Sequence, residues 1–116
     1  MYDFYWYPKC STCRKAKAQL DSQHVSYQAV DMIKTPPSAE LLTKWLSAGN
    51  FEMRKFFNSS GMKYRELGLK DKVASMSVQE AAQILASDGM LIKRPLIVKD
   101  GELIQIGYKE DKYKTL

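Results

Sequence analysis

The order of the first elements is decided by residues 2–20, which read YDFYWYPKCSTCRKAKAQL. Residues 2–7 are aromatic with one exception and have high strand propensity, so they predict a buried strand that ends at the following proline. Residues 11–23 contain strong helix formers and neither glycine nor proline, which predicts a helix. Cys10 and Cys13 therefore lie where a strand ends and a helix begins.

The next part of the chain extends this beginning. Apolar and polar residues alternate over 25–30 and predict a second strand. A strand, a helix and a strand in close succession are typical of a βαβ unit with parallel strands. Helical patterns follow, one with Ser38 as its N-cap and another opened by the S-x-x-E capping box of Ser77 and Glu80. Between them, residues 51–69 predict two short helices.

Strand composition returns near the C-terminus. Residues 91–98 predict a third strand, an Asp-Gly turn follows within 99–102, and residues 103–106 predict the returning strand of a hairpin. Residues 108–116 predict a short charged helix. We therefore expect an α/β fold with a mixed four-stranded sheet and a helical insertion, about 36–90, between strands 2 and 3.

Composition limits the classes of function. The chain has 116 residues, 45% apolar and 27% charged, which is typical of a globular protein, and we expect one domain over residues 1–116. No apolar run could cross a bilayer and no signal peptide is recognisable, so we expect a cytoplasmic protein with no membrane partner. The 18 Lys and Arg exceed the 13 Asp and Glu, but the charges are interspersed, so direct nucleic-acid binding is not expected.

Only two cysteines are present, and they lie three positions apart. A secreted disulfide scaffold would need more cysteines at wider spacings. A structural zinc site needs four ligands, and His24 is the only other ligand of the usual kind, so we expect no metal. His24 falls at the far end of the predicted helix, where a cap or surface role is expected. With a disulfide scaffold and a zinc site both unfavoured, the cysteine pair is predicted to carry out redox chemistry.

Cys10 is the candidate nucleophile. The predicted helix N-terminus favours an anion, and Lys9, Arg14 and Lys15 add positive charge, so we expect a lowered thiol pKa. Cys13 lies one turn further along, where it would act as the resolving thiol that closes a disulfide with Cys10. The alternative is that both cysteines are small buried apolar residues.

A second candidate feature is the dipeptide of Arg94 and Pro95. A bond to proline just before a strand is a candidate for a cis peptide, and Arg94 would then be able to hold an oxyanion beside the thiolate. The alternatives are a surface cation at the start of a strand and an ordinary proline of an edge strand.

Five stretches of the sequence, spread over nearly the whole chain, resemble the arsenate reductase-like family, known as the ArsC/Spx family, within the thioredoxin fold. They are residues 7–16 (YPKCSTCRKA), 36–37 (PP), 64–69 (YRELGL), 91–98 (LIKRPLIV) and 107–111 (GYKED). The resemblance implies a thioredoxin-like sheet with a helical insertion.

The resemblance also implies roles for residues. In arsenate reductases of this family one cysteine attacks arsenate, three arginines bind it, and glutathione with glutaredoxin completes the cycle. Cys10 matches the nucleophile and Arg94 one arginine, whereas Asn58 and Gly107 stand where the other two fall. Efficient arsenate reduction is therefore not expected. Four neighbours in the same motifs are further candidate substrate-binding residues: Pro95, Ser11, Thr12 and Arg14.

The function expected from these observations is that of a thiol-based redox protein acting on a small oxyanion or a disulfide. It would work as a monomer with no bound cofactor and take electrons from glutathione, glutaredoxin or thioredoxin. Cys13, however, resembles the redox switch of Spx-type regulators, which bind the C-terminal domain of the RNA polymerase α subunit. A redox-sensing transcriptional regulator is therefore the alternative, and a family member without catalysis is a third.

Overall fold

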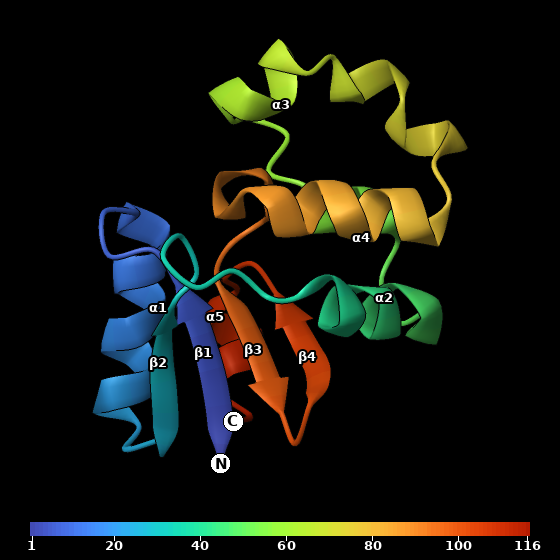
Figure 1. Ribbon diagram of the computed structural model, residues 1–116. Coiled ribbons are helices and arrows are strands. Elements are labelled where there is room, and N and C mark those ends of the chain that lie inside the picture. The colour runs from blue at the N-terminus through green and yellow to red at the C-terminus, as the bar shows by residue number, and fades with distance from the viewer. The chain divides into compact units, whose positions relative to one another are not determined.

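The computed structural model describes all 116 residues, which form two compact units (Figure 1). The first unit combines Met1–Met32 with Arg94–Leu116 and contains the whole sheet, whereas the second unit, Ile33–Lys93, is helical. No helix of the structure has the length and apolar character needed to span a lipid bilayer.

The first unit is built on a four-stranded mixed sheet with the strand order β2-β1-β3-β4. Its strands are β1 (Tyr2–Trp6), β2 (Tyr27–Asp31), β3 (Leu96–Lys99) and β4 (Glu102–Ile106). β1 runs parallel to β2 and antiparallel to β3, and β3 and β4 form a hairpin. The hairpin turn consists of Asp100 and Gly101, with φ angles of 51° and 82°, a conformation that Asp-Gly adopts readily. The expected α/β fold with a mixed four-stranded sheet is confirmed.

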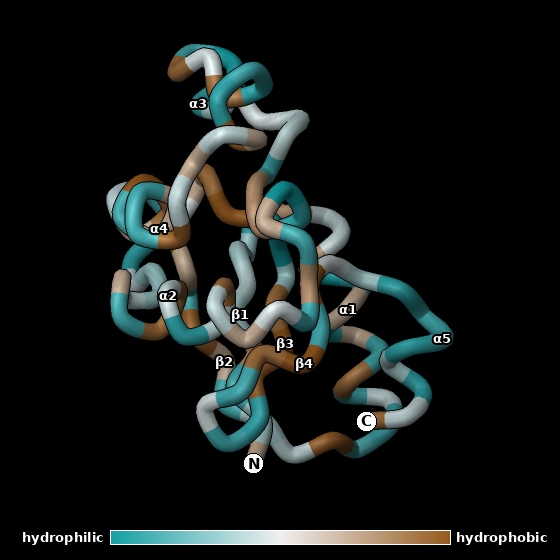
Figure 2. The backbone as a smooth tube through the Cα atoms, turned by 90° about the vertical axis from the view of Figure 1, so that its right-hand side faces the viewer, coloured by the Kyte–Doolittle hydropathy of each residue, from teal (hydrophilic) through white to brown (hydrophobic).

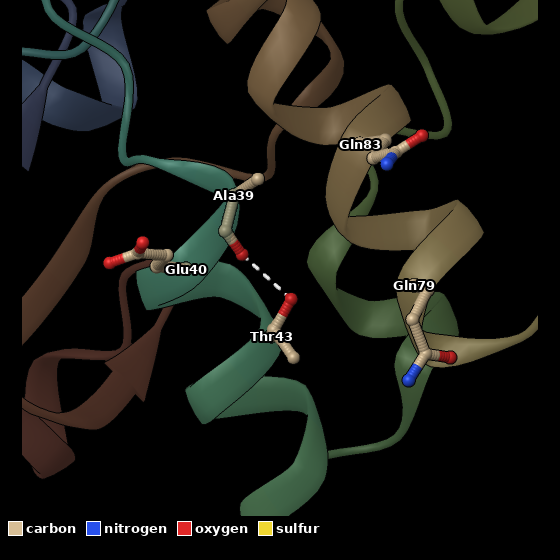
Figure 3. A pocket seen from close by; sticks show the side chains of 5 residues that line it. All are labelled: Ala39, Glu40, Thr43, Gln79 and Gln83. Carbon is tan, nitrogen blue, oxygen red and sulfur yellow. Dashed lines mark hydrogen bonds between the residues drawn. The ribbon is translucent and has the colours of Figure 1, made fainter.

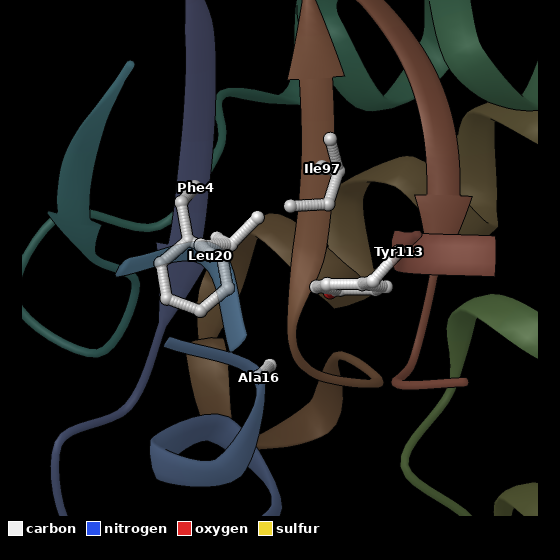
Figure 4. Packing of buried hydrophobic residues seen from close by; sticks show 5 residues of the cluster. All are labelled: Phe4, Ala16, Leu20, Ile97 and Tyr113. Atoms are coloured by element: carbon white, nitrogen blue, oxygen red, sulfur yellow. The ribbon is translucent and has the colours of Figure 1, made fainter. Parts of the chain in front are cut away.

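The core of this unit lies on one face of the sheet. Phe4 of β1 and Ile97 of β3 are direct cross-strand partners, so their side chains point to the same side. They pack with Ala16 and Leu20 of α1 (Ser11–Ser22) and with Tyr113 of α5 (Glu110–Tyr113), all of them fully buried (Figure 4). Figure 2 shows the hydrophobic stretch of β3 in brown. Both helices therefore cover the same face.

The C-terminal helix α5 has only four residues, fewer than the predicted 108–116. A helix this short is not stable by itself, so tertiary contacts must hold it. Gln19 Nε2 donates to the carbonyl of Glu110 at 3.1 Å, and Gln23 Nε2 donates to that of Tyr113 at 2.8 Å. The Tyr108 hydroxyl donates to Gln19 Oε1. Gln19 of α1 and Gln23, the residue that caps the C-terminus of α1, thus anchor the end of the chain.

The second unit contains three α-helices and several short 3-10 turns. The α-helices are α2 (Ala39–Ala48), α3 (Met62–Glu66) and α4 (Val78–Ser87), and the turns are Met53–Phe56, Leu69–Asp71, Val73–Ser75 and Gly89–Leu91. α2 and α4 lie side by side, burying Trp45 from α2 and Leu85 from α4. The predicted caps are confirmed: Ser38 accepts from Leu41 N at 3.2 Å, and Ser77 and Glu80 form the capping box.

Two predicted strand boundaries are wrong. The second strand begins at Tyr27, not at residue 25, because His24 adopts a left-handed φ of 56° and Val25 N bonds back to the end of α1. The third strand begins at Leu96, not at residue 91, because a 3-10 turn replaces its start and Ile92 forms an isolated bridge within the second unit. In both places local hydrogen bonds override the strand propensity of apolar residues.

Candidate active site

Cys10 occupies the N-cap of α1. Its backbone is extended, with φ −91° and ψ 121°, and its Sγ accepts a hydrogen bond from the backbone N–H of Cys13 at 3.4 Å. A serine or aspartate oxygen usually makes this contact, so the sulfur replaces the normal capping oxygen. The Cys10 N–H in turn donates to the carbonyl of Tyr7 at 2.9 Å. The half-buried Cys10 sulfur is therefore placed at the positive end of the helix dipole.

Cys13 is the third residue of α1 and is fully buried. No disulfide joins Cys10 and Cys13 in the structure. Burial raises the pKa of Cys13 to about 12, against a hydrogen bond from the Tyr7 backbone that lowers it, and the neighbouring Cys10 raises it further. Cys13 consequently keeps its proton at neutral pH.

Cys10 differs from Cys13 in the direction of its pKa shift. Partial burial raises the pKa of Cys10, but this effect is outweighed by hydrogen bonds from the Cys13 backbone, the Cys13 thiol and the Arg94 side chain, together with the Arg94 charge. The net pKa is lower than the ordinary thiol value of 9.0. Because the thiolate is the nucleophilic form, Cys10 is the more reactive of the two sulfurs.

Arg94 supplies the positive charge at this site. Its peptide bond to Pro95 is cis, the first of the two alternatives left open by the sequence, and Pro95 is buried with its carbonyl accepting from Gly107 N at 2.8 Å. The Arg94 guanidinium lies over the ring of Tyr7, 5.3 Å from the ring centroid. Its Nε and Nη1 atoms are buried and have no hydrogen-bond partner. Two donors of the guanidinium thus have unused hydrogen-bonding capacity.

The remaining predicted residues have different surroundings. Ser11 and Thr12 are exposed in the first turn of α1. Arg14 is also exposed, and its Nη1 donates to the carbonyl of Pro8 at 3.0 Å, which stabilises the turn that leads into Cys10. His24 lies exposed beyond the other end of α1. The contacts of Arg14 are therefore those of a residue that supports the loop.

Sequence reasoning missed Tyr7. The sequence predicts it as the last residue of a buried strand, but β1 ends at Trp6 and the Tyr7 ring contacts the Arg94 guanidinium. In the sequence, only the position of Tyr7 directly before Pro8 of the cysteine motif indicated that it lies near the site. Gly107, the position matched to a family arginine, offers only its backbone, with a φ of 77°.

Two other features of the structure were considered as sites. No group of three or more His, Cys, Asp and Glu side chains gathers as metal ligands would. A shallow depression of about 330 Å³ between α2 and α4 is lined by Ala39, Glu40, Thr43, Gln79 and Gln83 (Figure 3). It contains neither a thiol nor a cation, and the Thr43 hydroxyl already donates to the Ala39 carbonyl at 2.7 Å. The cysteine pair therefore remains the candidate site.

Fold and site together define a class. A cysteine pair at the start of the helix that follows β1, with a cis proline before β3, is the arrangement of thioredoxin-like dithiol proteins.

The chain belongs to the ArsC family, whose model matches residues 5–116. The crystal structure of a possible arsenate reductase from Streptococcus mutans UA159 is 55% identical, with a TM-score of 0.93 and 98% of each chain covered. YusI of Bacillus subtilis strain 168 is 50% identical over 111 residues, 96% of this chain and 93% of YusI. The global transcriptional regulator Spx of Streptococcus mutans is 29% identical over 108 residues, 93% of this chain and 77% of Spx. The resemblance noted from the sequence is confirmed.

Proposed function

We propose that this protein is a thiol-based reductase of small disulfides or oxyanions, with Cys10 as the nucleophile and Cys13 as the resolving thiol. The observation that carries the proposal is the Cys10 sulfur at the N-cap of α1, hydrogen-bonded to Cys13 N and lying beside a guanidinium with two unpartnered donors. This environment lowers the pKa of the Cys10 thiol and so increases its thiolate fraction, whereas the buried Cys13 keeps its proton until the first step is complete.

With a disulfide substrate the reaction has two steps. The Cys10 thiolate attacks one substrate sulfur, so that the substrate S–S bond breaks, a mixed disulfide forms and the first product thiolate leaves. Cys13 then loses its proton and attacks the Cys10 sulfur, which releases the second product thiolate. The protein is left with a Cys10–Cys13 disulfide and has given two electrons to the substrate. Glutathione or glutaredoxin would restore the dithiol after reduction of other substrates; for net turnover of glutathione disulfide the electrons would come from thioredoxin.

Arg94 favours substrates that carry negative charge near the reacting sulfur, because its buried Nε and Nη1 lack partners. A disulfide with carboxylate groups, such as glutathione disulfide, meets this condition. For a tetrahedral oxyanion Arg94 alone offers less, since in the sequence Asn58 and Gly107 replace the other two arginines of the family's arsenate reductases. Each missing charged hydrogen bond is worth about 1.5–3 kcal/mol. We therefore expect arsenate to be reduced slowly.

The test is a single turnover with glutathione disulfide. Reduced wild-type protein should release two glutathione molecules and become an intramolecular disulfide, whereas Cys13→Ser should stop with one glutathione bound to Cys10, as mass spectrometry would show. Cys10→Ser should release none, and release at the wild-type rate would refute the assignment of the nucleophile.

Arg94→Ala should slow the first step about tenfold, equivalent to about 1.4 kcal/mol. The matched control is Lys99→Ala, because the Lys99 ammonium also lies over a tyrosine ring, that of Tyr2, at the opposite end of β1. Equal rates for the two variants would remove Arg94 from substrate binding.

The similarity to Spx supports a second candidate, a redox-sensing regulator that binds the RNA polymerase α subunit. In this case formation of the Cys10–Cys13 disulfide would change the affinity for that partner. A pull-down with the C-terminal domain of the α subunit, using oxidised and reduced protein in parallel, tests it. Absence of binding in both states would eliminate this candidate.

A further inference from the structure

The Arg94 guanidinium is held in an unusual way. A buried cation is normally paired with a carboxylate or fully hydrogen-bonded, because removing it from water is costly. Arg94 instead has two buried nitrogen atoms without a hydrogen-bond partner. Besides its interaction with the Cys10 sulfur, the guanidinium contacts the face of the Tyr7 ring, 5.3 Å from the ring centroid. An aromatic face attracts a cation without using any of its N–H donors, so these remain available to a ligand.

The backbone of Tyr7 is fixed to both cysteines. Its carbonyl accepts from the Cys10 N–H at 2.9 Å, and a hydrogen bond from its backbone reaches the Cys13 sulfur. The ring therefore extends from a residue whose position relative to the two sulfurs is already set. A cation stacked on this ring has its position relative to Cys10 set as well.

We propose that Tyr7 is a positioning residue of the dithiol site, whose ring holds the Arg94 guanidinium beside the Cys10 sulfur by stacking on it. The proposal rests on the role of Cys10 proposed above, since a fixed charge at this sulfur matters only if the sulfur reacts. Apart from Arg94, the titratable group that acts on Cys10 is Cys13. Lys9 is exposed, and the Arg14 guanidinium is engaged with the Pro8 carbonyl. Arg94 is thus the charge through which the ring acts.

The chain offers a matched control for the stacking itself. Tyr2, at the other end of β1, lies under the Lys99 ammonium at 5.4 Å, and both residues belong to the same pair of strands. Tyr2→Leu removes a ring with a stacked cation from the same sheet and leaves the cysteine site untouched. If Tyr2→Leu changes the pKa of Cys10 as much as Tyr7→Leu does, the change comes from disturbance of the sheet and not from loss of the Tyr7–Arg94 stacking.

The experiment measures the alkylation rate of Cys10 by iodoacetamide against pH, with peptide mass spectrometry to identify the modified sulfur. The midpoint of this profile is the pKa of the Cys10 thiol. Tyr7→Leu should raise the midpoint by roughly 0.5 unit, about a threefold loss of thiolate below the midpoint. Tyr7→Phe, which keeps the ring, and Tyr2→Leu should leave it at the wild-type value.

A double-mutant cycle decides whether the ring acts through Arg94. Arg94→Ala should raise the midpoint by itself, and adding Tyr7→Leu should then have no further effect. The proposal is overturned if Tyr7→Leu shifts the midpoint equally in both backgrounds, or if Tyr7→Phe shifts it as much as Tyr7→Leu. If Tyr7→Leu does not fold, wild-type proton NMR still tests the stacking. The Arg94 side-chain resonances should be shifted upfield by the ring, and random-coil values would refute it.

The two proposals fail in distinguishable ways, because the alkylation profile requires no substrate. If the cycle shows coupling and glutathione disulfide is not reduced, the positioning role of Tyr7 stands and the proposed function does not. If turnover occurs and the cycle shows no coupling, the reductase stands and Tyr7 has no positioning role.

Discussion

Raising the pH should lower the free energy of unfolding of this protein through the ionisation of Cys13, and the size of this decrease follows from the pKa of the thiol. The folded state holds the Cys13 proton up to a pKa of about 12, because the thiol is buried, whereas the unfolded chain releases it near the ordinary value of 9.0. Above pH 9 the folded state therefore binds more protons than the unfolded state, and the free energy of unfolding falls as pH rises. At about pH 10 the difference corresponds to about 1.4 kcal/mol.

The assay compares Cys10→Ser with Cys10→Ser/Cys13→Ala in urea unfolding under reducing conditions, at about pH 7 and pH 10. The shared Cys10→Ser background removes the titration of Cys10 from both proteins. The buried hydroxyl of Tyr113 is present in both proteins, and because burial is the main cause of its raised pKa and Cys13 a smaller one, most of its contribution cancels. The packing cost of Cys13→Ala is present at both pH values and cancels as well.

The expected result is an alkaline loss that is about 1.4 kcal/mol larger in the protein that retains Cys13. An equal loss in the two proteins would mean that Cys13 titrates in the folded state near its ordinary pKa. The proposal that Cys10 has a lowered pKa while Cys13 stays protonated would then be refuted for Cys13. A larger decrease in the free energy of unfolding in the protein without Cys13 would mean that folding lowers the pKa of Cys13.

Three further predictions concern stability. Cys10→Ala should lower the free energy of unfolding by about 1 kcal/mol relative to Cys10→Ser, because serine can cap α1 and alanine cannot; equal stability in urea would show that the cap is unimportant. Gln23→Ala should cost about 1 kcal/mol and speed hydrogen exchange in α5, since it removes the bond to the Tyr113 carbonyl; unchanged exchange would contradict the anchoring. Gly49→Ala should cost about 1 kcal/mol by thermal unfolding, because φ is 74° with open space around it, so a neutral result would point to backbone relaxation.

Much of the fold could be predicted because its signals are local. The aromatic run before the cysteines, the capping box of Ser77 and Glu80, and the Asp100-Gly101 turn each specify an element through neighbouring residues. The starts of β2 and β3 could not be predicted, since a left-handed His24 and the bridge made by Ile92 depend on contacts that periodicity does not encode.

The same division holds for the site. The placement of Cys10 at the start of a helix, and the Arg94-Pro95 bond as a candidate for a cis peptide, follow from spacing and residue type. The stacking of Tyr7 on Arg94 joins two distant parts of the chain through an attraction that leaves no sequence pattern. The glutamine contacts that anchor α5 were missed for a related reason, because glutamine on a helix is usually a surface residue.

Because a sulfur atom caps α1, the stability of this helix depends on the chemical state of Cys10. Oxidation or alkylation of Cys10 removes the negative charge that the Cys13 N–H contacts, so any such event also weakens the start of the helix. The glutamines near its other end carry the C-terminal segment. The oxidation state of Cys10 is therefore coupled to the stability of α1 and, through the glutamine contacts, to the C-terminal segment.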